Sequence, residues 1–224
     1  MAGKAVELRP YQKGIVRSVI AGVGDGGIGQ VHMACGTGKT VVAHQAAVGV
    51  LSAGETAAVL VPSLALAAQT LRSWRAMTSG PFDVLAVCSD DTVADAPVHA
   101  ADLTVPVTTQ VSEIAGWLAR PRAGLGLVLC TYASVGRLAE AVRRVGPLGL
   151  VICDEAHHLT GDSDSATRAI LRPGVLPDRR RLFMTATPRL NRRAPSAESS
   201  SVFGMNDEAV FGPVLDRYSF AEAI

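Results

Sequence analysis

The stretch MACGTGKT contains residue types whose spacing suits phosphate binding. Gly36 and Gly38 keep side chains away from the backbone, so that its N–H groups can surround an anion. Lys39 adds a charge that reaches terminal phosphates, and Thr40 adds a hydroxyl suited to Mg²⁺. A helical pattern follows, and a helix N-terminus also favours an anion. We therefore predict an ATP-binding loop formed by Gly36, Thr37, Gly38, Lys39 and Thr40.

A second pair of chemically capable residues, Asp154 and Glu155, follows the apolar run LGLVIC. An aspartate at the tip of a buried strand can hold Mg²⁺ through water, and the adjacent glutamate can polarise an attacking water. The pair could instead cap the next helix. Because a phosphate loop lies about 115 residues earlier, we favour catalysis. The predicted catalytic residues are Glu155, Lys39 and Asp154, and the predicted metal ligands are Thr40 and Asp154.

The same stretch, CDEAHH, also offers residue types that bind zinc. Cys153 lies on the apolar strand pattern and should point away from the loop that follows it. The sequence has no second cluster of Cys and His near it. We therefore favour the nucleotide interpretation over a zinc site, and we expect the four scattered cysteines to be buried thiols.

The elements that must position these residues alternate along the chain. Apolar strand patterns and helical patterns follow one another about six times, which is typical of a mostly parallel sheet with helices on both faces. The predicted strands are 30–34, 56–62, 82–90, 124–132, 148–154 and 180–188, with a small strand near 103–109. The predicted helices are 8–22, 39–54, 63–78, 111–120, 133–145 and 164–172.

The composition agrees with a sheet buried on both faces. The chain is 48% hydrophobic with a mean hydropathy of +0.27, yet no run approaches the ~20 apolar residues of a membrane span. The first ten residues lack the apolar stretch of a signal peptide. We therefore expect a cytoplasmic protein that does not enter a membrane.

One segment is rich in arginine. Eight arginines and one acidic residue, Asp178, lie between Arg168 and Arg193. They are either ordinary solvated surface or a basic face that adds salt-sensitive, sequence-independent affinity for DNA.

Taken together, the motifs resemble the first RecA-like domain of a superfamily 2 helicase or translocase of the DEAH-box type. The similarity is strongest to the motor subunits of type I and type III restriction enzymes. DEAH stands at 154–157, and MACGTGKT resembles the phosphate loop of that branch, in which a residue other than glycine, here Met33, often fills the first position. LRPYQ, VPSLALAAQ, CTYAS and FMTATPR resemble further motifs in the family's order. The resemblance covers about residues 8–189 and implies a RecA-like P-loop NTPase fold.

The resemblance also implies residue roles near the nucleotide. Gln12 would recognise adenine, since its amide offers both a donor and an acceptor. His157 would lie near the nucleotide, and Thr185 and Thr187 would couple nucleotide state to nucleic acid. Gln12 could instead be a solvated helix residue, and the two threonines could simply favour a strand.

Three further residues would contact the nucleic-acid backbone. These are Ser63, Thr131 and Tyr132, whose hydroxyl and N–H groups suit phosphate oxygens. Ser63 could instead be only a helix cap, and Tyr132 only a packing aromatic.

The resemblance finally implies an incomplete motor. We expect residues 1–188 to form the first RecA-like domain, 189–206 a flexible connector, and 207–224 the start of the link to a second RecA-like domain absent from this chain. That domain would supply arginine fingers, which contribute roughly 10³ to 10⁵ in rate in related systems.

The implied activity is hydrolysis of ATP with Mg²⁺, coupled to translocation on nucleic acid, in particular double-stranded DNA. The isolated chain should bind nucleotide weakly and hydrolyse it slowly or not at all. Two alternatives remain at this point: an ATPase that switches a protein partner without travelling on nucleic acid, and a nucleotide-binding module without catalysis.

Overall fold

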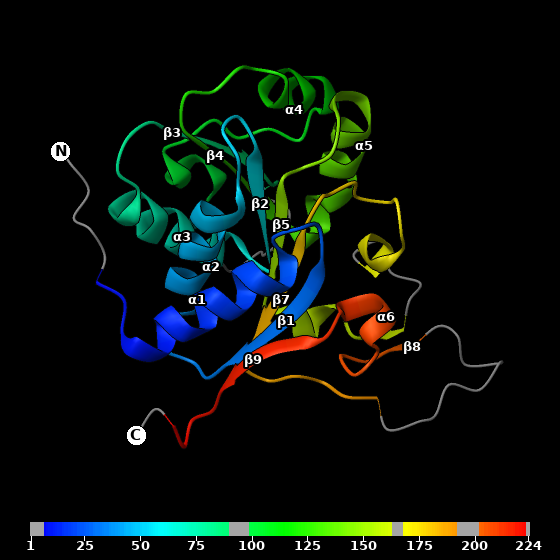
Figure 1. Ribbon diagram of the computed structural model, residues 1–224. Helices are drawn as coiled ribbons and strands as arrows, with labels where there is room; N and C mark the ends of the chain where they lie inside the picture. The colour runs from blue at the N-terminus through cyan, green and yellow to red at the C-terminus, as the bar shows by residue number, and fades with distance from the viewer. Residues whose placement is uncertain (1–6, 90–98, 163–167, 192–201, 223–224) are drawn as a thin grey trace.

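Seven strands form one sheet in the part of the chain that the computed structural model describes, residues 7–89, 99–162, 168–191 and 202–222 (Figure 1). Their order across the sheet is β3-β4-β2-β5-β7-β1-β9, and all neighbours run parallel. These strands are β1 (Ile28–Met33), β2 (Thr56–Val61), β3 (Phe82–Val87), β4 (Leu125–Thr131), β5 (Leu150–Asp154), β7 (Arg181–Thr185) and β9 (Val214–Tyr218). The predicted α/β fold with a parallel sheet is therefore confirmed.

Helices cover both faces of this sheet (Figure 1). The helices are α1 (Pro10–Val23), α2 (Lys39–Val50), α3 (Leu64–Met77), α4 (Val111–Leu118), α5 (Val135–Val145) and α6 (Glu208–Phe211). Helices α1, α2 and α3 share one apolar cluster with the sheet, and α4 and α5 share another with its opposite face. The helix layers therefore exclude water from both sides of the strands.

Strand β2 shows why the chain is so apolar. Ala57 and Val59 pack into the cluster under α1–α3, whereas Ala58 and Leu60 pack into the cluster under α4 and α5. Because successive side chains of a strand point to opposite faces, a strand covered on both sides must be apolar throughout. All six residues of β2 are buried.

Strand β9 is an unexpected member of the sheet. It pairs in parallel with β1 at one edge, although residues 207–224 are predicted from the sequence to lie beyond the domain. Buried Gln30 of β1 fixes the segment that leads to β9, since its Nε2 donates to the carbonyl oxygens of Met205 (2.9 Å) and Gly212 (2.7 Å). The strand that carries the phosphate loop is thus an inner strand.

Other differences from the predicted elements are local. The small strand expected near 103–109 is a single bridge between Ala86 and Val107. Within the predicted helix 164–172, a 3-10 turn spans Arg168–Leu171, and residues 163–167 lie outside the described residues. Residues 192–201 of the predicted connector lie outside them too, and β8 (Val202–Phe203) pairs antiparallel with β6 (Gly161–Asp162).

None of the helices within the described ranges has the length and apolar character needed to span a bilayer.

Candidate nucleotide-binding site

The predicted phosphate loop connects β1 to α2 in a conformation that only glycine adopts easily. Gly36 has φ +78° and Gly38 has φ +90°, and Gly38 is the residue that precedes α2. A Cβ atom on Gly38 would collide with Nε2 of Gln12, whereas one on Gly36 would meet nothing within 4 Å. The two glycines therefore serve different purposes: both allow the left-handed backbone, and Gly38 also allows α1 to approach.

Helix α1 holds the loop through the carbonyl of Thr37. That oxygen accepts hydrogen bonds from Tyr11 Oη (2.8 Å) and Gln12 Nε2 (3.1 Å). The Thr37 hydroxyl donates to the carbonyl of Ala34 at 2.7 Å. The motif LRPYQ predicts a role for Gln12 alone. The phenol of its neighbour Tyr11 is the signal in the sequence for a second donor to the loop.

Gln12 is buried and already has two partners. Its Oε1 accepts from the backbone N–H of Arg9 at 3.0 Å, in addition to the bond from Nε2 to the loop. An amide group has two donor hydrogens and two acceptor lone pairs. One N–H and one lone pair therefore remain for a ligand, and the predicted role in reading adenine stays a prediction.

The predicted acidic pair lies across from the loop, at the carboxyl end of β5. Asp154 ends that strand, and Glu155 follows with φ +49°, a left-handed conformation that is uncommon for a residue with a side chain. Oε1 of Glu155 lies 3.6 Å from Nζ of Lys39, and both side chains are largely buried. The fold thus joins the two candidate motifs through an ion pair.

Asp154 is a buried carboxyl in an unfavourable electrostatic environment. Burial raises its pKa to about 6, and the charge of Glu155 adds to the rise. A hydrogen bond from the Glu155 N–H and the charge of Lys39 lower the pKa in part. The positive charge and hydrogen bonding around Asp154 therefore do not compensate for burying its carboxylate. Shifted pKa values of this kind are common at functional sites.

His157 connects the acidic pair to β7. Its Nδ1 lies 2.9 Å from Thr185 Oγ1 and 3.4 Å from Glu155 Oε2. Thr185 Oγ1 also accepts the backbone N–H of Thr187 at 3.1 Å, and Thr187 Oγ1 lies 3.5 Å from the same imidazole nitrogen. Burial lowers the pKa of His157, with His158 as the next cause. The predicted coupling residues therefore form one network with Glu155.

The three residues predicted to contact nucleic acid are buried or half-buried in the structure. Thr131 and Tyr132 are buried, and the Tyr132 hydroxyl donates to the carbonyl of Asp154 at 2.8 Å. Tyr132 packs in the apolar cluster that includes α4 and α5, and the Thr131 hydroxyl donates to Ser134 Oγ at 3.2 Å. The prediction that these two side chains contact nucleic acid therefore conflicts with their burial. Ser63 is half-buried and caps α3 by accepting from the Leu66 N–H at 3.3 Å.

The arginine-rich segment does not form one basic face. Arg181 is buried and binds Asp178, with 2.6 Å between Nε and Oδ2. Arg180 bonds to the carbonyls of Gly24 and Gly149 and to Glu55. Arg180 and Arg181 therefore hold the start of the inner strand β7 in place. Because their side chains are bound inside the protein, they are not part of a continuous DNA-binding surface.

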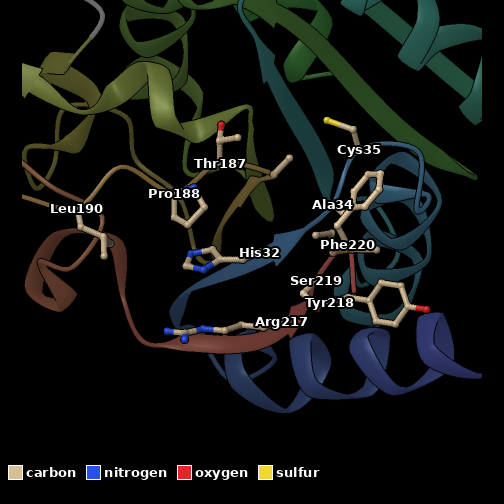
Figure 2. A pocket seen from close by; sticks show the side chains of 12 residues that line it. His32, Ala34, Cys35, Thr187, Pro188, Leu190, Arg217, Tyr218, Ser219 and Phe220 are labelled. Atoms are coloured by element: carbon tan, nitrogen blue, oxygen red, sulfur yellow. The ribbon is translucent and has the colours of Figure 1, made fainter. Parts of the chain in front are cut away.

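A cavity of about 490 Å³ lies beside the loop, on the side of β9 (Figure 2). Ala34 and Cys35 form part of its wall, together with residues that follow β7 and the end of β9. The expectation that all four cysteines are buried is wrong for Cys35, which is exposed, and right for Cys88, Cys130 and Cys153. Neither Lys39 nor the acidic pair lines the cavity. The cavity therefore adjoins the candidate chemical site but is separate from it, and Leu190 and Phe220 leave large apolar side chains exposed at its margin.

Known proteins resemble the chain in sequence. The family described as "Type III restriction enzyme, res subunit" matches residues 5–190. "ATP-dependent DNA helicase RecG" from Mycobacterium bovis and from Mycobacterium tuberculosis is 36% identical over 154 residues, which are 68% of this chain and 19% of each relative. The chain thus spans about a fifth of the curated relatives it matches.

Solved structures resemble this chain in fold. "ATP-dependent Type ISP restriction-modification enzyme LlaBIII bound to DNA" has a TM-score of 0.80 and 27% identity, covering 98% of this chain and 15% of that one. The "Pyrococcus furiosus Hef helicase domain", at 17% identity and a TM-score of 0.60 over 95% of this chain and 38% of that one, supports the fold alone. These relatives support a RecA-like, helicase-type ATPase domain. The chain belongs to the family of the type III restriction enzyme res subunit.

Proposed function

We propose that the loop Gly36–Thr40 binds ATP and that the acidic pair at the end of β5 hydrolyses it. The observation that carries this proposal is the 3.6 Å ion pair between Lys39 and Glu155. A residue suited to phosphate and a residue suited to activating water meet there, although 115 positions separate them. Two unrelated structural roles would not require these side chains to converge.

The residues present fit ATP with Mg²⁺. Gly36 borders open space, as an anion cradle requires. Thr40 and Asp154 offer the oxygen donors that Mg²⁺ prefers, and the raised pKa of Asp154 indicates a carboxylate that a cation would stabilise. Mg²⁺, when bound, would neutralise charge on phosphate oxygens.

Each side chain would then have a distinct task. Lys39 would leave Glu155 and bind the terminal phosphates. Glu155, released from Lys39, would orient the attacking water and accept its proton. His157 contacts both Glu155 and Thr185, so it would report the state of the nucleotide to β7. Gln12 would use its remaining donor and acceptor to recognise adenine.

We further infer that this domain drives translocation on double-stranded DNA, as a DEAH-type motor, and that a second RecA-like domain completes it. The resemblance to LlaBIII bound to DNA and to the DNA helicase RecG supports this inference. An ATPase switch that acts on a protein partner is the other candidate. The network that joins His157, Thr185 and Thr187 favours the motor, because β7 leads from the nucleotide toward the exposed Thr187–Leu190 segment.

Nucleotide binding by this chain tests the proposal. Titration with a fluorescent ATP analogue and Mg²⁺ should give saturable binding that Lys39→Ala weakens at least about tenfold, since a charge-assisted phosphate contact is lost. Lys13→Ala, at an exposed position of α1, is the matched control and should bind as the wild type does. Equal binding by the Lys39→Ala and Lys13→Ala variants would contradict the proposal.

A longer chain that includes the second domain tests the motor. Double-stranded DNA should stimulate its ATP hydrolysis, and Thr185→Val should reduce that stimulation more than the basal rate. Hydrolysis that is indifferent to DNA would favour the protein switch instead.

A further inference from the structure

The end of β9 is connected to the phosphate loop in two ways, one direct and one through α1. The backbone N–H of Ala34, where the loop begins, donates to the carbonyl of Tyr218 at 3.0 Å. The Tyr218 ring stacks on Tyr11, with 3.9 Å between centroids and 5° between planes. Tyr11 in turn donates its hydroxyl to the carbonyl of Thr37. Tyr218 thus reaches Ala34 directly and Thr37 through Tyr11.

Two further hydrogen bonds hold Tyr218 and the strand that carries it. Its hydroxyl donates to the carbonyl of Glu222 at 2.7 Å. Ser18 of α1 donates to Asp216 Oδ2 at 2.8 Å and so ties the helix to β9. Figure 2 shows Tyr218 beside that helix, which is drawn in blue. The stacked pair therefore lies on a framework of β1, β9 and α1.

The geometry of the peptide bond gives these contacts a functional meaning. In a trans peptide the C=O and the following N–H point in opposite directions. Tyr11 and Gln12 hold the Thr37 carbonyl toward α1, so the N–H of Gly38 points to the other side of the loop. That N–H is one of the donors that an anion on the loop would need.

We propose that Tyr218 is a positioning residue for the phosphate loop and that it acts by holding Tyr11 against Thr37. The proposal rests on the function proposed above for the loop. Tyr218 does not touch the nucleotide; it sets the direction of the Gly38 N–H before nucleotide arrives. Displacement of the chain that follows β9 would then change nucleotide affinity.

Three single variants separate this role from ordinary packing. Tyr11→Phe keeps the stack and removes the bond to Thr37. Tyr218→Leu removes the stack, and Tyr218→Phe keeps it while losing the bond to Glu222. Tyr11→Phe and Tyr218→Leu should each weaken binding of the fluorescent ATP analogue about three- to tenfold. Tyr218→Phe should stay within about twofold of the wild type.

The nucleotide affinity of the double variant distinguishes the proposed coupling from independent packing effects. Because both changes act on one contact, Tyr11→Phe combined with Tyr218→Leu should weaken binding by less than the product of the single effects. Multiplicative effects, or equal affinity of Tyr218→Leu and Tyr218→Phe, would overturn the proposal.

Hydrogen exchange distinguishes failure of this proposal from failure of the proposed function. In the nucleotide-free chain, amides of residues 36–39 should exchange at least about threefold faster in Tyr218→Leu than in Tyr218→Phe. Unchanged exchange would overturn the positioning role even if the wild type binds ATP. Faster exchange in a wild-type chain that binds no ATP would leave the positioning of the loop supported and the proposed function refuted.

Discussion

Lys39 and Glu155 form an ion pair, with 3.6 Å between Nζ and Oε1. One residue begins α2 and the other follows β5, and β7 lies between β5 and β1 in the sheet. The pair therefore spans the carboxyl ends of three neighbouring strands. Open parallel sheets bind ligands at this edge, because loops from separate strands converge there.

Glu155→Gln should separate hydrolysis from binding. The amide cannot accept a proton from water, so single-turnover hydrolysis by the longer chain that includes the second domain should fall about 10²- to 10⁴-fold. Nucleotide affinity should be retained or improved, because Lys39 loses a competing anion. Glu140→Gln, which breaks the exposed pair with Arg144, is the control and should leave both quantities unchanged. A parallel loss of affinity and rate in Glu155→Gln would argue against the assigned role.

Alanine at the two loop glycines should have unequal effects on stability. Both substitutions place a side chain in the left-handed region, which costs about 1–2 kcal/mol. Gly38→Ala should cost about 1 kcal/mol more, because the new methyl group displaces Gln12 from Thr37. Urea denaturation of both variants measures the difference. Equal free energies of unfolding would show that α1 adapts to the added methyl group.

The pKa of Asp154 predicts how pH acts on metal binding. Its folded-state pKa of about 6 exceeds the ordinary value of 3.8. The protonated form cannot hold Mg²⁺, so Mg²⁺-dependent nucleotide affinity should rise between about pH 5 and pH 7 and then level off. Titrations at constant ionic strength measure this profile, and a flat profile would contradict the assignment.

The same group makes a prediction for stability. A raised carboxyl pKa means that the folded state binds the proton more tightly, so the free energy of unfolding falls as pH rises from about 4 to about 6. Asp154→Asn should therefore stabilise the nucleotide-free chain at pH 7 by about 1–3 kcal/mol. Thermal unfolding at pH 4 and pH 7 measures it. A variant that is less stable than the wild type at pH 7 would refute this account.

Arg181 should matter for stability and not for DNA. It binds Asp178 and the carbonyls of Ile170 and Leu176. Arg181→Leu leaves a buried carboxylate unpaired and should cost about 3–5 kcal/mol in urea denaturation. The control Arg172→Leu, at an exposed position, should stay within about 0.5 kcal/mol. If Arg181→Leu folds normally and only DNA affinity falls, the segment is a DNA-binding surface after all.

The sequence could predict the two motifs and the sheet because each depends on local rules. Gly36 and Gly38 have backbones that favour glycine, and Asp154 ends a strand that is apolar on both faces. A loop after one strand and an acid after another must meet at the same sheet edge when all strands run parallel. Their meeting through Lys39 and Glu155 follows from topology.

Side-chain direction could not be predicted in the same way. In a strand buried on both faces, no polar alternation tells which side a residue faces, so the sequence did not indicate that Thr131, the last residue of β4, is buried. The same holds for Tyr132, which begins the turn after that strand. Strand β9 was missed for a related reason: VLDRY contains Asp216 and Arg217, and an edge strand tolerates such charges. The sequence did contain one signal for β9: Gln30 is a polar residue in the apolar strand β1, and a buried polar side chain needs hydrogen-bond partners.

The position of β9 also decides where this chain can be shortened. A truncation after Arg189 would turn β1 into an edge strand and strip Gln30 of both carbonyl partners. The exposed edge of β1 could then pair with strands of other molecules. The buried side-chain amide of Gln30, left without hydrogen-bond partners, would destabilise the fragment. We therefore expect such a fragment to keep the motifs named above and still aggregate, because residues 202–222 complete the sheet of this domain.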